Sequence, residues 1–352
     1  MPSCPRSEIV REGKAGVYHV WSRCVRRAFL CGIDPLTNKD YSHRRDWICD
    51  FQQRLAALFG IEVGFHAELS NHLHLLLRAR PDVVKTWTDE EVIRRMMTVF
   101  RLVKSKDGQT IRELTDTEVA AAMSDPERIV VLRKRISSVS SFMQALCEHI
   151  ALRANREDDS SGCFWESRFR ARSLENESAI LVCGIYIDLN QIRAGETLTP
   201  EDSTHTSAYD RIEARKAQIA GTTTSGEMRA DGWLCELTLD QQTETFVGAT
   251  TSQTPWRASD KGLLPIALED YLELLDWTGR TVREDKKGAI PWHLAPILDR
   301  LGINQNLWTD LTTKFDSQFS HVVGTAAQVV DRAKQAGRQW YQKRARCQEA
   351  FG

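Results

Sequence analysis

Alternating apolar and polar residues predict strands in the first part of this chain. The clearest pattern is in residues 68–78, ELSNHLHLLLR, where histidine and leucine alternate from His72 onward. In a strand, His72, His74 and Leu76 share one face, and the neighbouring leucines share the other. The segment is therefore expected to bury leucines on one side of a sheet and to present two imidazoles side by side on the other.

The neighbouring patterns predict an α+β fold. Before the His-x-His segment come a strand that starts at residue 16, a helix over about 47–59 and a second strand over 61–68. After it come a long helix over about 126–156, an arginine-rich strand over 163–172 and a helix over 175–195. A crossover helix followed by a hairpin is typical of a ferredoxin-like antiparallel sheet with helices on its faces.

The rest of the chain is predicted to be mainly helical. Residues 81–125 are expected to form a helical insertion, in which Thr88 and Thr115 are each followed three positions later by glutamate, as in a helix N-cap. We expect a first domain over 1–215, a linker over 216–232 that is rich in threonine, serine and glycine, and an accessory helical region over 233–352.

The composition indicates an ordinary globular protein but does not indicate a particular function. The hydrophobic fraction is 41% and the charged fraction 27%, as in ordinary globular proteins. No apolar run approaches the roughly 18 residues that span a bilayer, and the N-terminus lacks the apolar core of a secretory signal. The nine cysteines are scattered and form no CxxC pair. We therefore expect a reduced, cytoplasmic protein that has no membrane partner.

The His-x-His strand is a candidate metal site. Neutral imidazole is the commonest metal-ligating side chain, so His72 and His74 could supply half of a divalent-cation site. A second candidate pair is Tyr186 and Asn190, which lie one helical turn apart in the predicted helix. The alternatives are a polar strand surface for the histidines and a buried, hydrogen-bonded hydroxyl for the tyrosine.

Two groups of arginines are candidates for binding phosphate. Arg168, Arg170 and Arg172 share one face of the predicted strand over 163–172. A second group, Arg23, Arg26 and Arg27, follows the end of the first strand. Rows of arginine are well placed to contact a sugar-phosphate backbone. The alternatives are a solvated edge strand protected by its charge and a solvated basic turn.

Four segments in order carry a resemblance to a known family. The segments YHVWSR, SNHLHLLLR, FWESRFRAR and YIDLNQIRAG resemble the single-tyrosine HUH transposases, in particular the REP-associated tyrosine transposases. The name HUH denotes two histidines flanking a hydrophobic residue, here His72 and His74. The resemblance covers roughly residues 10–215 and is interrupted by the predicted insertion. One departure is Gln191, where related chains commonly carry proline.

The resemblance implies an activity and assigns roles to residues. Tyr186 would be the nucleophile, and His72, His74 and Asn190 would ligate Mg²⁺ or Mn²⁺. The substrate would be single-stranded DNA with hairpins, cut through a 5′-phosphotyrosine and rejoined, with the arginines contacting its backbone. The enzyme would be associated with the nucleoid. A homodimer is one implied arrangement, because some relatives exchange the tyrosine helix between subunits.

Two other interpretations remain open at the level of sequence. The first is a hairpin-binding protein of the same ancestry that has lost catalysis. The presence of all four candidate site residues argues against it. The second is a metal-free structural or regulatory α+β protein whose motifs are accidental. The sequence does not distinguish a mobile element's transposase from a single-copy enzyme that processes palindromes.

Overall fold

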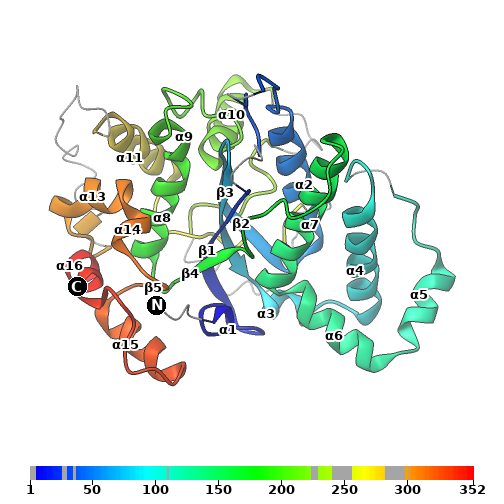
Figure 1. Ribbon diagram of the computed structural model, residues 1–352. Helices are drawn as coiled ribbons and strands as arrows, with labels where there is room; N and C mark the ends of the chain where they lie inside the picture. The colour runs from blue at the N-terminus through cyan, green and yellow to red at the C-terminus, as the bar shows by residue number, and fades with distance from the viewer. Residues whose placement is uncertain are drawn as a thin grey trace.

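A five-stranded sheet lies at the centre of the computed structural model (Figure 1). The structure describes residues 5–25, 30–34, 37–108, 111–222, 229–239, 256–281, 298–299 and 301–352. The strands are β1 (Gly16–Arg23), β2 (Ile61–Glu68), β3 (His72–Ala79), β4 (Arg170–Leu174) and β5 (Val322–Val323), in the order β2-β3-β1-β4-β5. The first four strands pair antiparallel, which confirms the predicted α+β fold. The short β5 pairs parallel to β4 and makes the sheet mixed, which the sequence did not predict.

The pairing register places residues from three strands on one face of the sheet. On β1, Trp21 pairs with His74 of β3 on one side and with Arg170 of β4 on the other. His19, two residues earlier on β1, pairs with Arg172 of β4. Because paired residues project to the same side of a sheet, this register gathers histidine, tryptophan and arginine on the face that His72 and His74 share.

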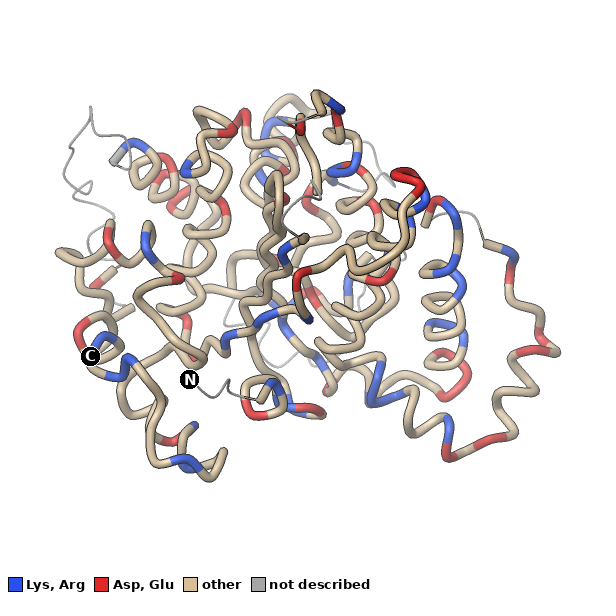
Figure 2. Tube along the Cα trace, in the orientation of Figure 1, with Lys and Arg blue, Asp and Glu red and all other residues tan. Residues whose placement is uncertain are grey.

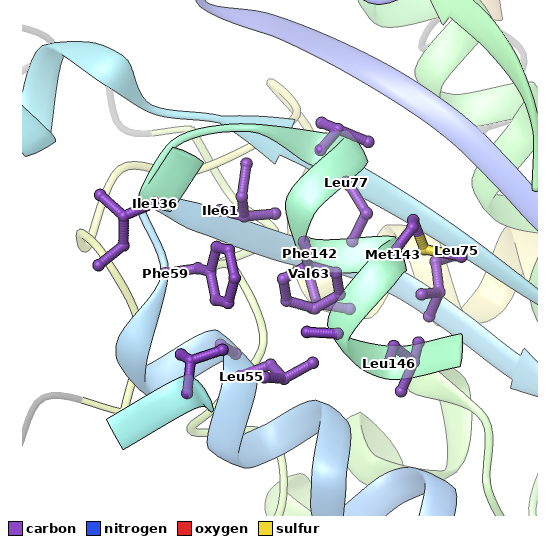
Figure 3. Close-up of a cluster of buried hydrophobic side chains, with 14 of the residues drawn as sticks. Leu55, Phe59, Ile61, Val63, Leu75, Leu77, Ile136, Phe142, Met143 and Leu146 are labelled. Carbon is purple, nitrogen blue, oxygen red and sulfur yellow. The ribbon is translucent and has the colours of Figure 1, made fainter. Parts of the chain in front are cut away.

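The opposite face of the sheet is covered by a helical layer that forms the first core. The helices are α2 (Arg44–Leu58), α4 (Asp89–Lys104), α6 (Pro126–Ile136) and α7 (Val139–Glu157), with α3 (Pro81–Val84) and α5 (Asp116–Met123) beside them. Leu73, Leu75 and Leu77 of β3 are fully buried there. Figure 3 shows Leu75 and Leu77 among aromatic and aliphatic side chains of α7 and of the segment around α2. As predicted, Thr88 and Thr115 cap α4 and α5.

The face that bears the histidines is covered by a second layer built around α8 (Glu177–Asp188). Every residue of α8 from Ser178 to Asp188 is buried. At Gly184 a Cβ atom would lie 2.6 Å from the Phe65 ring, so only glycine allows α8 to approach β2 this closely. Helices from late in the sequence cover the other side of α8: α11 (Leu268–Thr281), α13 (Trp308–Thr313) and α14 (Phe315–Gln318). The C-terminal residues thus share one hydrophobic core with α8.

The remaining elements are short or peripheral. They are α1 (Arg6–Ile9), α9 (Asn190–Arg193), α10 (Ser207–Ala220), the 3-10 helix η2 (Gln305–Leu307), α15 (Ala326–Gln335) and α16 (Arg344–Phe351). Figure 2 shows basic and acidic residues interspersed over both helical layers. Among the residues that the structure describes, no helix has the length and apolar character needed to cross a membrane. The division into domains at 215 and 233 stays a prediction.

Three predicted elements differ in extent from those observed. The helix expected over 126–156 is interrupted between α6 and α7, because the Ser138 hydroxyl caps a new helix by accepting from Ser141 N–H. The strand expected over 163–172 begins only at Arg170. The helix expected over 175–195 ends at Asp188, and a separate turn, α9, begins at Asn190. Tyr186 and Asn190 therefore do not lie on one continuous helix.

Candidate active site

The two histidines of β3 lie in contact beside the strand β1. The ring centroids of His72 and His74 are 4.8 Å apart, with the planes nearly perpendicular. His74 is buried, whereas His72 is partly accessible. Trp21 of β1 stacks above His74 at 6.5 Å between centroids. The strand alternation predicted from sequence therefore does bring both imidazoles to one site.

A third histidine, His19 of β1, completes this cluster. Its Nε2 lies 2.9 Å from Nδ1 of His74, and both rings are buried. Burial lowers the pKa of His19 to about 3 and lowers that of His74 well below its usual value, so both are neutral at physiological pH. The sequence analysis missed His19, although its signal was present: His19, Trp21 and Arg23 alternate along β1 as His72 and His74 do along β3.

The hydrogen bonds of the histidines leave ring nitrogens available to a ligand. His72 Nδ1 lies 2.6 Å from Oδ1 of Asn71; because an amide oxygen only accepts, Nδ1 carries the proton and Nε2 keeps its lone pair. His74 Nε2 is buried and has no hydrogen-bond partner within the described part of the chain. Two neutral imidazoles with free Nε2 atoms fit the chemistry of a divalent transition-metal ion.

Tyr186 reaches the same site from α8. Its ring packs edge-on against His74, with 5.6 Å between centroids, and the Arg193 guanidinium lies 4.5 Å from the centroid of the tyrosine ring. The side chain is 4% exposed. Burial, reinforced by the nearby Asp316 carboxylate, raises the pKa of Tyr186 well above its usual value. The phenol is therefore protonated at neutral pH, and its hydroxyl donates a hydrogen bond to Oδ2 of Asp316 at 2.7 Å.

Asp316 belongs to α14 and pairs with Arg172 of β4. Arg172 Nη1 bonds the Asp316 carboxylate, and Nη2 donates to its main-chain oxygen at 2.9 Å. The guanidinium stacks over Trp21 at 4.6 Å and is 5.5 Å from the Phe315 ring centroid. Burial alone would raise the pKa of Asp316, but the Arg172 guanidinium lowers it below its usual range. No sequence pattern signals Asp316, because its position depends on the packing of the C-terminal helices against α8.

Asn190, the predicted third metal ligand, is buried at the start of α9. Its Nδ2 has no hydrogen-bond partner within the residues that the structure describes. Asn190 is not among the residues that line the cleft in front of His72 and His74. The structure thus brings together Tyr186 and both histidines, and ligation by Asn190 stays a prediction.

An open cleft of about 410 Å³ lies in front of the histidine pair. It is lined by Arg23, Arg168 and Arg170, together with Asp316 and the two histidines. A second hollow of about 640 Å³ shares Arg168, Arg170 and Trp21 with it and extends toward the C-terminal helices. These arginines give the wall of the cleft the positive charge that a phosphate backbone requires.

The other predicted phosphate-binding arginines are placed differently. Arg172 is buried and is engaged with Asp316, so it does not extend into solvent as the other arginines do. Arg26 and Arg27 lie outside the described residues.

A separate group of potential metal ligands lies deep in the fold. Ligand atoms of Cys49, His66 and Glu68 are within 4.8 Å of one another and could hold a metal ion. His66 Nδ1 lies 3.0 Å from Glu68, however, and Nε2 lies 3.2 Å from Asp210. Burial alone would lower the pKa of His66, but these carboxylates raise it to about 10. At neutral pH the protonated ring pairs with two carboxylates, and it could bind a metal only after losing a proton.

Comparisons with known proteins add little to this geometry. The sequence matches no protein-family model. No curated protein matches it either. Among solved structures, the chain is distantly similar to a REP-associated tyrosine transposase bound to a REP hairpin. The match has a TM-score of 0.32 and 11% identity, and covers 64% of this chain and 93% of the other. A likeness of this extent carries no conclusion about function.

Proposed function

We propose that this protein is a metal-dependent single-stranded DNA endonuclease and strand transferase that cuts beside hairpins through a 5′-phosphotyrosine. The observation that carries the proposal is the contact between Tyr186 of α8 and His74 of β3, at a cleft lined with arginine. A nucleophile, two neutral imidazoles and a basic cleft are the parts that this reaction needs. The proposal is supported by the contact of candidate residues for these parts, which come from separate segments of the chain.

The metal would be Mg²⁺ or Mn²⁺, held by Nε2 of His72 and His74 and by the side-chain oxygen of Asn190. When bound, it would polarise the scissile phosphate and offset the charge that develops in the transition state. The free His74 Nε2 supports this assignment. With uncharged ligands we expect modest affinity, and stronger binding of Mn²⁺ than of Mg²⁺, because imidazole favours transition metals.

Tyr186 would perform the cleavage. Its Oη attacks the phosphorus, a P–Oη bond forms, and the bond from phosphorus to the 3′ oxygen of the upstream strand breaks. The downstream strand stays on Tyr186 through its 5′ phosphate, and the upstream strand ends in a free 3′-OH. Attack of a 3′-OH on the phosphotyrosine rejoins strands, since the phosphotyrosine conserves the energy of the original bond.

The cleft would bind the DNA backbone beside the cut. Arg23, Arg168 and Arg170 line it, and phosphate contacts from arginine position a strand without reading its sequence. Hairpin recognition is proposed for the same face, where the larger hollow continues from the cleft.

The test is a covalent adduct between protein and DNA. The protein is incubated with labelled single-stranded hairpin DNA and Mn²⁺ and is then separated on a denaturing gel. We expect an adduct that disappears with EDTA and in Tyr186→Phe. A matched control is Tyr209→Phe, since Tyr209 lies on α10 and is not among the residues lining the cleft. An adduct that persists in Tyr186→Phe would contradict the proposed nucleophile.

The burial of Tyr186 favours one second candidate, a hairpin-binding protein that does not cut. A nucleophile that is 4% exposed must be uncovered, or must meet its phosphate from the cleft side, before it can react. A retained gel shift on hairpins without any adduct would support this second function. If several hairpins from both strands give neither an adduct nor a gel shift, both candidate functions are overturned.

A further inference from the structure

The C-terminal region contributes two consecutive side chains to the candidate active site. Phe315 is fully buried and packs against Tyr186, with 5.5 Å between ring centroids. Asp316, the next residue, accepts the hydrogen bond of the Tyr186 hydroxyl through Oδ2 at 2.7 Å. Neither residue belongs to the four segments on which the family resemblance rests.

We propose that Asp316 is a further catalytic residue, which holds the Tyr186 hydroxyl beside the histidines and accepts its proton when the oxygen attacks a DNA phosphate. This inference rests on the proposed function of Tyr186. It makes the C-terminal region a part of the reaction centre, where the sequence suggested only an accessory region.

The carboxylate is fixed in place on one side and open on the other. Its two oxygens have different partners, because Oδ1 accepts from Arg172 and Oδ2 accepts from Tyr186. Arg172 in turn stacks over Trp21, so the acid is anchored to the sheet. The side chain of Asp316 is nevertheless 42% exposed, and it lines the same cleft as His72 and His74. An anchored acceptor that faces the substrate cleft has the placement that a general base requires.

The competing acceptors are placed less well. His19 and His74 meet Tyr186 edge to face, with 6.0 Å and 5.6 Å between ring centroids. Among the described residues, Asp316 is the group for which a hydrogen bond from the Tyr186 hydroxyl is observed. If His74 also holds the metal, its free Nε2 is committed to that role.

In the proposed cleavage step the phenolic proton moves to Asp316 and the phosphoryl group moves to Tyr186. The Oη–H bond breaks and its proton moves to Oδ2 of Asp316, while a lone pair on Oη forms the bond to phosphorus. The P–O3′ bond breaks, and the 3′ oxygen leaves with its electron pair and takes a proton from water, which leaves a hydroxide in the solvent. In the joining step the attacking 3′-OH returns its proton to the solvent, and this proton neutralises the hydroxide. The phenolic proton becomes more acidic as the ester bond forms, so a weak base suffices. In the joining step, Tyr186 leaves the phosphorus and recovers the proton from Asp316.

Rates of adduct formation test the proposal. We compare the wild type with Asp316→Asn, Asp316→Glu and the control Asp331→Asn, which changes an exposed acid on α15. General-base contributions are typically about 10²–10⁴-fold, and we expect a loss of that size in Asp316→Asn. Asp316→Glu should recover part of the rate, and Asp331→Asn should match the wild type. Hairpin gel shifts should be retained in all three variants, and unchanged in Asp331→Asn.

A modified substrate separates proton acceptance at Tyr186 from protonation of the leaving group. A 3′-bridging phosphorothiolate leaves as a thiolate and needs no proton. We expect Asp316→Asn to be as defective on this substrate as on normal DNA. Recovery on the phosphorothiolate would instead make Asp316 an acid for the leaving group and would overturn the proposal.

Chemical rescue provides a second variant in case Asp316→Asn does not fold. In Asp316→Ala the space of the carboxylate is vacant, so sodium formate should raise the rate of adduct formation, but it should not do so in the wild type or in Tyr186→Phe. Absence of rescue, a wild-type rate in Asp316→Asn, or a faster rate in that variant would overturn the role of Asp316. Absence of any adduct from the wild type would instead overturn the proposed function itself.

Discussion

Two buried histidines on adjacent strands of the sheet differ in charge: His66 is protonated at neutral pH, whereas His74 is neutral. His66 of β2 contacts Glu68 and Asp210 directly, and its pKa is raised to about 10. His74 of β3 is equally buried, but its pKa is lowered, and its Nδ1 partner is the neutral His19. Burial alone disfavours charge on both rings. The difference therefore comes from the position of the nearest carboxylates.

The carboxylate nearest to His74 is already committed to other partners. Asp316 is bound by Arg172 and by the Tyr186 hydroxyl, so it does not accept a hydrogen bond from a histidine within the described residues. Only a neutral imidazole can ligate a metal. The neutral rings of His72 and His74 are thus suited to bind a cation. The cluster at His66 already contains a cation, because the His66 ring is itself protonated. Among these buried histidines, local carboxylate contacts separate a candidate cation site at His74 from an ion-paired cluster at His66.

The largest effect is expected from removing the imidazole of His74. His74→Ala should lower Mn²⁺ affinity by more than about 100-fold, since even groups behind the ligands account for about 10–100-fold. The measurement is titration of the apoprotein followed by the paramagnetic signal of free Mn²⁺. The matched control is His66→Gln, which should retain Mn²⁺ binding. If His66→Gln lost the metal and His74→Ala kept it, the assignment of the two clusters would have to be reversed.

A smaller effect is expected from His19, whose ring contacts that of His74. A metal bound at Nε2 of His74 requires the ring proton to be on Nδ1. The Nδ1–H of His74 should then donate to Nε2 of His19, across the observed 2.9 Å contact. His19→Phe keeps a ring of similar shape but removes the acceptor, and should weaken Mn²⁺ binding by about 10–100-fold. His19→Gln, which can still accept, should weaken it less. Equal affinities in the two variants would show that the contact is only steric.

The smallest effect is a pH dependence of stability from His66. Because its pKa is higher in the folded chain, its contribution is complete below about pH 6.5 and is lost as pH rises toward 10. Between about pH 7 and 9, the free energy of unfolding should fall more steeply in the wild type than in His66→Gln, by at most about 1.4 kcal/mol per pH unit. Urea unfolding at several pH values measures this slope. Parallel slopes would mean that His66 is neutral in the folded protein.

The sequence predicted those features that follow from local periodicity. Alternation in residues 72–77 placed leucines on one face of β3 and histidines on the other, and the structure buries Leu73, Leu75 and Leu77 as expected. The antiparallel pairing of the first four strands also agrees with the sheet predicted from strand and helix patterns. The break at Leu189 was not predicted, because the apolar pattern of α8 continues through it without a glycine or proline. Periodicity identifies which residues share a face, but it does not fix where a helix ends.

The sequence alone thus determined the α+β fold and the clustering of His72 and His74, because both arise from neighbours along a strand. Only the tertiary structure decided that Asp316 meets Tyr186, since 130 residues separate them and hydrophobic burial of α13 and α14 against α8 brings them together. The tertiary structure also decided the charge of each histidine. A pKa depends on the solvation and the partners that folding supplies, and neither is encoded at a single position.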